Sequence, residues 1–246
     1  MANKYKITNI ATGHYIQLKK KRGKMRIYKG INPEKDQSYY LWGLNHNVLD
    51  KLITPLGTYD KKKVIETASS CGLDFLAQKK ESSGLCFAKG KVFEKVLKEY
   101  IPDLEKKINS GDIINKKGEI IGRHKGYIYY TIGQKRGLEM DIMGDLCVAK
   151  IDATSNTLIV DHWESLFSRE FSITDTHFIN HADLNNAAGT QVKIRGFGLN
   201  PPGNCHLDFS NKNTRVYLDE PAWALAPGQP AVFYSDDLLL GGGIII

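Results

Sequence analysis

The sequence predicts an α/β N-terminal part followed by a C-terminal β-barrel. Apolar residues recur at helical spacing in several segments before about residue 100. From about residue 111 the apolar residues alternate with polar ones, as they do in strands. Beyond residue 147, short alternating segments follow one another at near-regular spacing with turn residues between them. That pattern is typical of a small closed barrel or sandwich of about 100 residues.

The first predicted elements are a hairpin and three helices. Alternation over Tyr15–Leu18 and Met25–Lys29, with a turn around Arg22 and Gly23, predicts the hairpin. A helix is expected over Ser38–Leu52, where Leu41, Leu44, Val48 and Leu52 form one stripe. A second helix is expected to begin after Asp60, which caps it, and to end at Gly72. Its buried face would consist of Val64, Ala68 and Cys71. A third spans Lys91–Tyr100, with Phe93, Val96, Leu97 and Tyr100 facing inward, and ends before Pro102.

Strands account for the rest of the chain. A second hairpin turns at Lys117 and Gly118, and a third joins Cys147–Ile151 to Thr157–Asp161 through Ser155 and Asn156. Further strands are expected at residues spread over the last third of the chain, namely Phe171, Val192, Cys205, Val216, Val232 and Leu240. The spacing of apolar residues changes along the chain, and these changes place domain boundaries near residues 80 and 147.

Length and composition describe a globular protein. With 246 residues, 41% hydrophobic and 10% aromatic, the chain can bury a core and exceeds one typical domain. No apolar run approaches the roughly 18 residues of a membrane span, so no membrane partner is expected. The start, MANKYKITNI, has no export signal, which predicts a cytoplasmic location.

The charge balance allows two interpretations. Lysine and arginine number 34 against 27 acidic residues, a net charge of +7, and most of the excess precedes about residue 140. Such a surface is either a solvated lysine-rich face or a face that binds a polyanion through phosphate contacts.

Among the four cysteines, Cys86 is the candidate reactive thiol. The four are far apart, without the ligand spacing of a structural zinc site, and thiols are expected in a reducing compartment. Cys86 lies near Gly84 and several lysines, whose charge favours the nucleophilic thiolate. Taken alone, a cysteine between two apolar neighbours is more often a core residue. For Cys71, Cys147 and Cys205 the core interpretation is favoured.

Several ordered motifs resemble one family. They are ATGHY at Ala11–Tyr15, KDQSY at Lys35–Tyr39, SSGLCF at Ser82–Phe87, the long segment Gly118–Leu138, Asp219–Tyr234, and the terminal LGGGIII. Together they resemble the tRNA-specific 2-thiouridylases over nearly the whole chain. The resemblance implies three parts: residues 1–79 as the tail of an adenine nucleotide alpha hydrolase-like catalytic domain, 80–146 as a central α/β tRNA-binding domain with the cysteine loop, and 147–246 as a barrel similar to the second domain of elongation factor Tu.

The resemblance also implies a chemistry. A family member replaces an oxygen of the tRNA wobble uridine with sulfur and uses ATP and Mg²⁺ to make that oxygen a leaving group. The sulfur arrives as a persulfide from a sulfur-carrier protein or a cysteine desulfurase, and Cys86 matches the acceptor position. A second cysteine upstream, and an ATP-binding loop of the SGGVDSS type, have no counterpart in this sequence. We therefore expect either a fragment or a truncated paralogue, acting as a monomer.

Other positions match the family's binding residues. Gly13 matches a glycine near the adenine nucleotide, and His14 a position that contacts tRNA. The triplet Lys35, Asp36 and Gln37 matches further tRNA contacts. In the barrel, Gln229 matches another contact. Arg195 and Gly196 match a pair of tRNA-contacting positions. In the family this pair is an arginine followed by an aromatic residue, whereas here a glycine follows the arginine.

Two other functions compete with sulfur transfer. A catalytically incomplete tRNA-binding fragment or paralogue would keep the basic face and the barrel but would not activate uridine. A sulfur-carrier or redox protein would use Cys86 alone and would have no affinity for tRNA.

Overall fold

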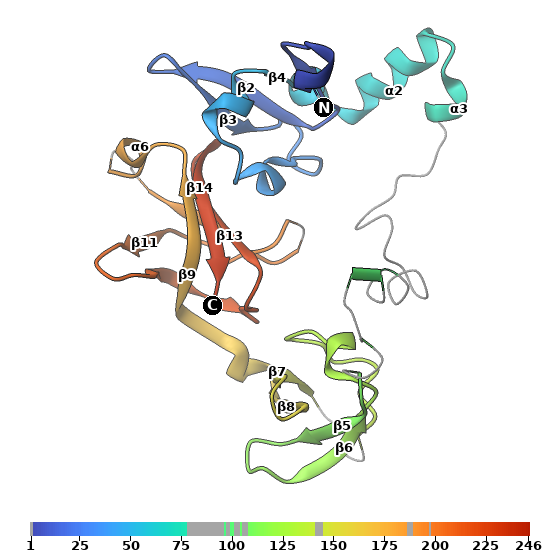
Figure 1. The fold of residues 1–246 in the computed structure, drawn as a ribbon, viewed down its shortest axis with the longest axis vertical. Coiled ribbons are helices and arrows are strands. Elements are labelled where there is room, and N and C mark those ends of the chain that lie inside the picture. The colour runs from blue at the N-terminus through green and yellow to red at the C-terminus, as the bar shows by residue number, and fades with distance from the viewer. Residues whose placement is uncertain are drawn as a thin grey trace. The chain divides into compact units, whose positions relative to one another are not determined.

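The computed structural model describes residues 2–77, 96, 99–100, 104, 108–140, 145–185, 189–196 and 198–246. The chain divides into two units, one formed by Met1–Gln78 with Ser168–Ile246 and the other by Lys79–Phe167. Each unit is a body of its own, and Figure 1 shows the course of the chain through both. Within the described residues, no helix combines the length and the apolar character needed to cross a membrane.

The C-terminal segment of the first unit forms a barrel-like sheet. Its strands are β9 (Phe167–Phe178), β10 (Gln191–Lys193), β11 (Cys205–Asp208), β12 (Thr214–Trp223), β13 (Pro230–Ser235) and β14 (Leu238–Ile245). They are ordered β10-β13-β14-β9-β12-β11. The amide of Cys205 donates to the carbonyl of Thr190 at 2.6 Å, which brings the two ends of this order together. The barrel is confirmed, and so are the strands expected near Phe171, Val192, Cys205, Val216, Val232 and Leu240.

The barrel interior is filled by alternate residues of its strands, since side chains on a strand point to opposite faces in turn. This core includes Phe171, Ile173, Val192, Ile194, Val216, Leu218, Phe233 and Leu240. Cys205 is also part of it, as expected, and burial raises the pKa of its thiol to about 12.

The N-terminal segment of the same unit extends this sheet. The expected hairpin is confirmed as β2 (Ile16–Lys21) and β3 (Lys24–Lys29), and its turn places Arg22 and Gly23 at positive φ. β3 pairs with β14 through Tyr28 and Leu238. A second cluster combines Ile16, Ile27, Tyr39 and Leu49 with barrel residues Ile179, Val232, Tyr234 and Leu239. The two segments therefore share one core.

The remaining elements of this unit are short. They are η1 (Ala2–Tyr5), β1 (Ile10–Ala11), η2 (Ser38–Leu41), α1 (His46–Leu49), β4 (Leu52–Ile53), η3 (Pro55–Thr58), α2 (Lys61–Ser70), α3 (Asp74–Ala77) and α6 (His181–Asn185). β1 and β4 pair in parallel.

The single helix expected over Ser38–Leu52 is wrong. The segment contains η2, then α1, then β4. Asn45 has extended backbone angles, and its side chain accepts from the amide of Val48, so a new helix starts there. In consequence Leu49 is buried, whereas Val48 is 37% exposed.

The cap of α2 is confirmed, but its buried face is not. The side chain of Asp60 accepts from the amide of Lys63 at 2.7 Å, and Gly72 ends the helix at positive φ. No residue of α2 is buried, and Cys71, expected in the core, is exposed. The third expected helix, Lys91–Tyr100, lies largely outside the described residues; Tyr100, expected to face inward, is 76% exposed.

The second unit holds a four-stranded sheet of order β6-β5-β8-β7. Its elements are β5 (Gly111–Ile114), β6 (Ile120–His124), η4 (Tyr127–Tyr129), β7 (Leu146–Asp152), β8 (Thr157–His162) and η5 (Trp163–Leu166). Both expected hairpins are present, and Gly118 and Asn156 have positive φ in their turns.

The third hairpin does not lie in the C-terminal barrel. β8 pairs in parallel with β5, and Ile113, Val148, Leu158 and Val160 share one core. A two-stranded hairpin is marginally stable alone, so the hairpin of β5 and β6 supplies the partner that the hairpin of β7 and β8 needs. Residues 146–162 thus belong with the central strands, although the change of period grouped them with the barrel.

Candidate nucleic-acid interface

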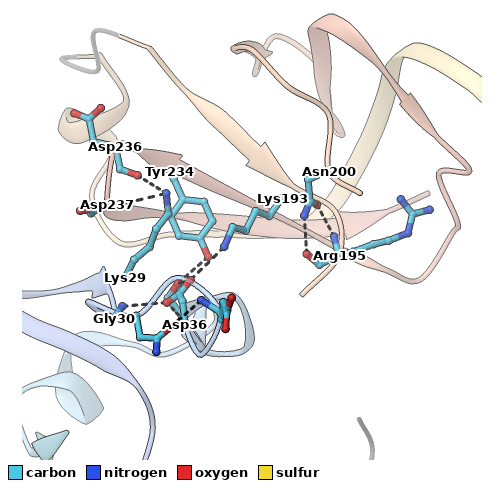
Figure 2. A network of polar contacts seen from close by, with 12 residues as sticks. Lys29, Gly30, Asp36, Lys193, Arg195, Asn200, Tyr234, Asp236 and Asp237 are labelled. Atoms are coloured by element: carbon cyan, nitrogen blue, oxygen red, sulfur yellow. Dashed lines mark hydrogen bonds and ion pairs between the residues drawn. The ribbon is translucent and has the colours of Figure 1, made fainter. Parts of the chain in front are cut away.

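The loop that carries Lys35, Asp36 and Gln37 joins β3 to η2 and is held by the carboxylate of Asp36. Asp36 is 5% exposed and accepts from the amide of Gly30 at 3.2 Å. It also accepts from the amide and hydroxyl of Ser38 at 3.1 and 2.9 Å, and from Lys193 Nζ at 3.2 Å. These donors all come from the protein, so Asp36 fixes the shape of the loop. Figure 2 shows it between Gly30 and Lys193.

Gln37 ties this loop to the ATGHY segment. Its Oε1 accepts from the amide of Tyr15 at 3.0 Å, and its own amide donates to the Tyr15 carbonyl at 3.3 Å. His14 is half-buried, with Nδ1 2.5 Å from the hydroxyl of Thr12. Gly13 is exposed, and a Cβ there would approach only Leu56 Cδ1, at 3.8 Å. The protein's own packing therefore leaves room for a side chain at position 13.

Arg195 directs its guanidinium at the protein itself. It donates to the carbonyls of Leu199, Trp223 and Ala224 at 3.2, 2.9 and 2.8 Å, and its guanidinium lies 5.7 Å from the Trp223 ring centroid. Burial lowers its pKa from the ordinary value. Asn200 completes the loop by accepting from the amide of Arg195 at 3.0 Å and donating to its carbonyl at 3.1 Å. Figure 2 shows this exchange.

Gly196 packs closely against two tyrosine side chains. A Cβ at this position would lie 2.4 Å from the Tyr40 hydroxyl and 3.2 Å from Tyr39 Cδ1. No real Cβ contact is as short as the first, so any side chain would push Tyr40 away. In this chain, the position after Arg195, where the family has an aromatic residue, is a glycine whose backbone lies close to Tyr40.

Tyr39 joins the N-terminal loop to two segments of the barrel, one at Ile194 and one at Pro230. Its hydroxyl lies 3.2 Å from the Ile194 carbonyl and 2.9 Å from the Pro230 carbonyl, and it donates to them. Burial raises the pKa of Tyr39 to about 12, so the hydroxyl keeps its proton at neutral pH. Gln229 precedes Pro230 and is half-buried, and its side-chain Oε1 is buried with no hydrogen-bond partner in the part of the chain that the structure describes.

The structure thus brings together most of the residues that the sequence singled out. Residues 35–37, 195–196 and 229 lie around Tyr39, and Gln37 connects this group to the backbone of Tyr15, the residue after His14. Sequence reasoning missed Lys29 and Lys193, which flank Tyr234 beside Asp36. Asp36 and Lys193 are 157 positions apart in the chain, so no local pattern links them.

Cys86 and its SSGLCF motif lie outside the described residues. Of the other cysteines, Cys71 is exposed, whereas Cys147 and Cys205 are buried as expected. Among the described residues no cluster of three or more His, Cys, Asp or Glu side chains is arranged to hold a metal ion.

Three family models match successive parts of the chain. The tRNA methyl transferase HUP domain matches residues 1–90, the tRNA methyl transferase PRC-barrel domain residues 94–162, and the aminomethyltransferase beta-barrel domain residues 168–245. The limits of the second and third models agree with the placement of β7 and β8 in the central sheet.

Curated relatives match nearly the whole chain. The tRNA-specific 2-thiouridylase MnmA of Chlorobium phaeobacteroides is 38% identical over 96% of this chain and 66% of its own length. The tRNA-specific 2-thiouridylase MnmA 2 of Phocaeicola vulgatus is 38% identical over 98% of this chain and 67% of its own. The corresponding protein of Neorickettsia sennetsu is 34% identical over 100% of this chain and 65% of its own. This chain spans about two thirds of the length of these relatives and belongs to the tRNA-specific 2-thiouridylase family.

Proposed function

We propose that this chain acts in the 2-thiolation of tRNA, as a sulfurtransferase that moves sulfur from a protein persulfide to the wobble uridine. Membership of the family across nearly the whole chain supports the reaction. The observation that carries the proposal is that residues 35–37, 195–196 and 229, which come from separate segments matched to tRNA contacts, lie in the segments that Tyr39 joins.

Sulfur delivery is the part of the reaction that we assign to Cys86. The terminal sulfur of a Cys86 persulfide attacks C2 of the uridine and forms a carbon–sulfur bond as the activated oxygen leaves. A second thiol then attacks the Cys86 sulfur, forms a disulfide with it, and releases the 2-thiouridine. That second thiol provides the electrons that break the sulfur–sulfur bond.

The proposal includes ATP and Mg²⁺, which would make the uridine oxygen a better leaving group. Among the described residues no cluster of three or more metal-ligating side chains is present, and we derive no step through either group. A sulfur-carrier protein or a cysteine desulfurase would load Cys86. We further propose that the chain works as a monomer in the cytoplasm.

Burial does not exclude Cys71 from reacting with a persulfide, because this cysteine is exposed. The sequence predicted that it lies on a buried helix face, but it is exposed at the C-terminal end of α2. A Cys71→Ser variant is therefore assayed beside Cys86→Ser, because Cys71 is also accessible to a persulfide donor.

The test loads the chain with a ³⁵S-persulfide donor and supplies tRNA, ATP and Mg²⁺. We expect label on the protein and a mercury-retarded, thiolated tRNA. In Cys86→Ser both signals should disappear, whereas tRNA affinity should stay within about twofold, since a serine hydroxyl accepts no sulfur but has nearly the same size. A Cys86→Ser protein that still accepts sulfur would remove Cys86 from the mechanism.

The same assay distinguishes the two alternatives. Binding of tRNA without thiolation, under conditions in which Cys86 is loaded, would identify a tRNA-binding protein that is catalytically incomplete. Persulfide loading with no affinity for tRNA would identify a sulfur carrier.

A further inference from the structure

A polar cavity opens in the first unit beside the Asp36 loop. It has a volume of about 240 Å³, and its lining includes Lys29 at the end of β3, Lys193 at the end of β10 and Tyr234 on β13. The loop Pro201–Gly203 forms another wall. Because two consecutive prolines restrict the backbone of that loop, this wall is comparatively rigid.

Two ammonium groups share one aromatic ring in this cavity. Lys29 Nζ lies 4.9 Å and Lys193 Nζ 5.4 Å from the centroid of Tyr234. Their side chains are only 23% and 28% exposed. Figure 2 shows both lysines extending to Tyr234 from different segments of the chain. The ring attracts each cation, so the pair is held close together despite their like charge.

The acidic groups nearby neutralise the two lysines unequally. Lys193 contacts the buried carboxylate of Asp36 at 3.2 Å. Lys29 donates to the backbone carbonyl of Asp236 at 2.7 Å, but its ion-pair distance to Asp237 Oδ1 is 3.9 Å, and the Asp237 side chain is 72% exposed. An ion pair of this length in solvent contributes little. The positive charge of Lys29 is therefore incompletely compensated.

The pKa of Lys29 is lowered, first by burial and second by the charge of Lys193. The side chains of Asp237, Asp36 and Asp236 act in the opposite direction but do not restore the ordinary value. An anion placed between the two lysines would relieve this repulsion and would replace part of the lost hydration. The cavity thus favours a negatively charged ligand.

The surroundings of the cavity indicate which anion. Asp36, which binds Lys193, anchors the loop of residues 35–37, and Asn200 on the cavity wall also holds Arg195. Two residues that line the cavity, Lys193 and Asn200, therefore hydrogen-bond residues matched to tRNA contacts. We propose that Lys29 and Lys193 bind a backbone phosphate of tRNA in this cavity, an inference that rests on the proposed function.

The salt dependence of tRNA binding tests this site. In Lys29→Gln, loss of one phosphate contact should reduce the slope of log K against log salt by about 0.7–0.9 and weaken binding about fivefold at 0.1 M salt. Lys29→Arg keeps the charge and should preserve the wild-type slope. Lys212, exposed between β11 and β12, provides the matched control, and Lys212→Gln should also keep that slope.

The outcomes show which of the two proposals fails. A Lys29→Gln slope equal to that of the wild type overturns the cavity site alone, whether or not the melting temperature changes, because a purely structural lysine would affect stability only. If the wild-type chain binds no tRNA, both this inference and the proposed function fail. If tRNA binds and Lys29→Gln flattens the slope but no thiolation occurs, the cavity site stands and the sulfur-transfer proposal does not.

Discussion

At the scale of single residues, one buried ion pair links the two segments of the first unit. Arg26 on β3 is 1% exposed, and its Nε lies 3.1 Å from Asp183 Oδ2 on α6. Lys21 Nζ lies 3.7 Å from the other carboxylate oxygen. A buried guanidinium depends on such a partner because the interior provides little of the hydration that it had in water.

Substitution of Asp183 should therefore be strongly destabilising. Asp183→Ala leaves the Arg26 charge buried without its carboxylate, and we expect the free energy of unfolding to fall by about 3–5 kcal/mol. Urea unfolding followed by circular dichroism measures this. Glu34 is exposed, and Glu34→Gln should stay within about 0.5 kcal/mol of the wild type. A loss below about 1 kcal/mol for Asp183→Ala would show that the pair contributes little.

At the scale of elements, Gly242 on β14 allows neighbouring groups to pack closely against the strand. A Cβ at Gly242 would lie 2.7 Å from the Ala231 carbonyl and 2.9 Å from Trp42 Cε3. Trp42 is partly buried and packs against the core shared by the two segments. The absence of a side chain at Gly242 thus lets a large aromatic ring lie directly on the strand.

Gly242→Ala should displace Trp42. Overpacking at such a contact typically costs about 1–3 kcal/mol, and we expect a loss of that size together with a shift in tryptophan fluorescence. Gly43 is a suitable control because a Cβ there meets nothing within 4 Å. Equal unfolding midpoints for Gly242→Ala and Gly43→Ala would refute the packing argument.

At the scale of the whole molecule, the first unit is built from the two ends of the chain. Residues 1–78 and 168–246 contribute to one core, while residues 79–167 are inserted between them in sequence. If the N-terminal segment is removed, Ile179, Val232 and Leu239 lose the apolar neighbours that cover them. Exposed apolar surface of this kind promotes association and weakens folding.

The fragment 168–246 should consequently fail to unfold cooperatively on its own. Adding the fragment 1–78 should restore a cooperative thermal transition, since it returns Ile16, Ile27 and Leu49 to the shared core. Circular dichroism and size-exclusion chromatography of the separate and mixed fragments measure this. A sharp transition in isolated 168–246, unchanged by the second fragment, would contradict the shared core.

The sequence by itself determined the local elements and the family. Alternating apolar residues and turn residues such as Gly118 and Asn156 fixed the hairpins, and Asp60 fixed the start of α2, because strand period, positive φ and capping depend on neighbouring residues. The helix over Ser38–Leu52 failed where the Asn45 cap outweighed a helical stripe. The ordered motifs fixed the family across nearly the whole chain.

Only the tertiary structure decided which elements meet. It paired β5 with β8, left Cys71 exposed, and placed Lys193 against Asp36. A local pattern shows that one face of a strand or helix is apolar, but not which distant segment will cover it. Those choices arise from hydrogen bonds and burial between residues far apart in the chain, and here they assemble the region around Tyr39 and the two-lysine cavity.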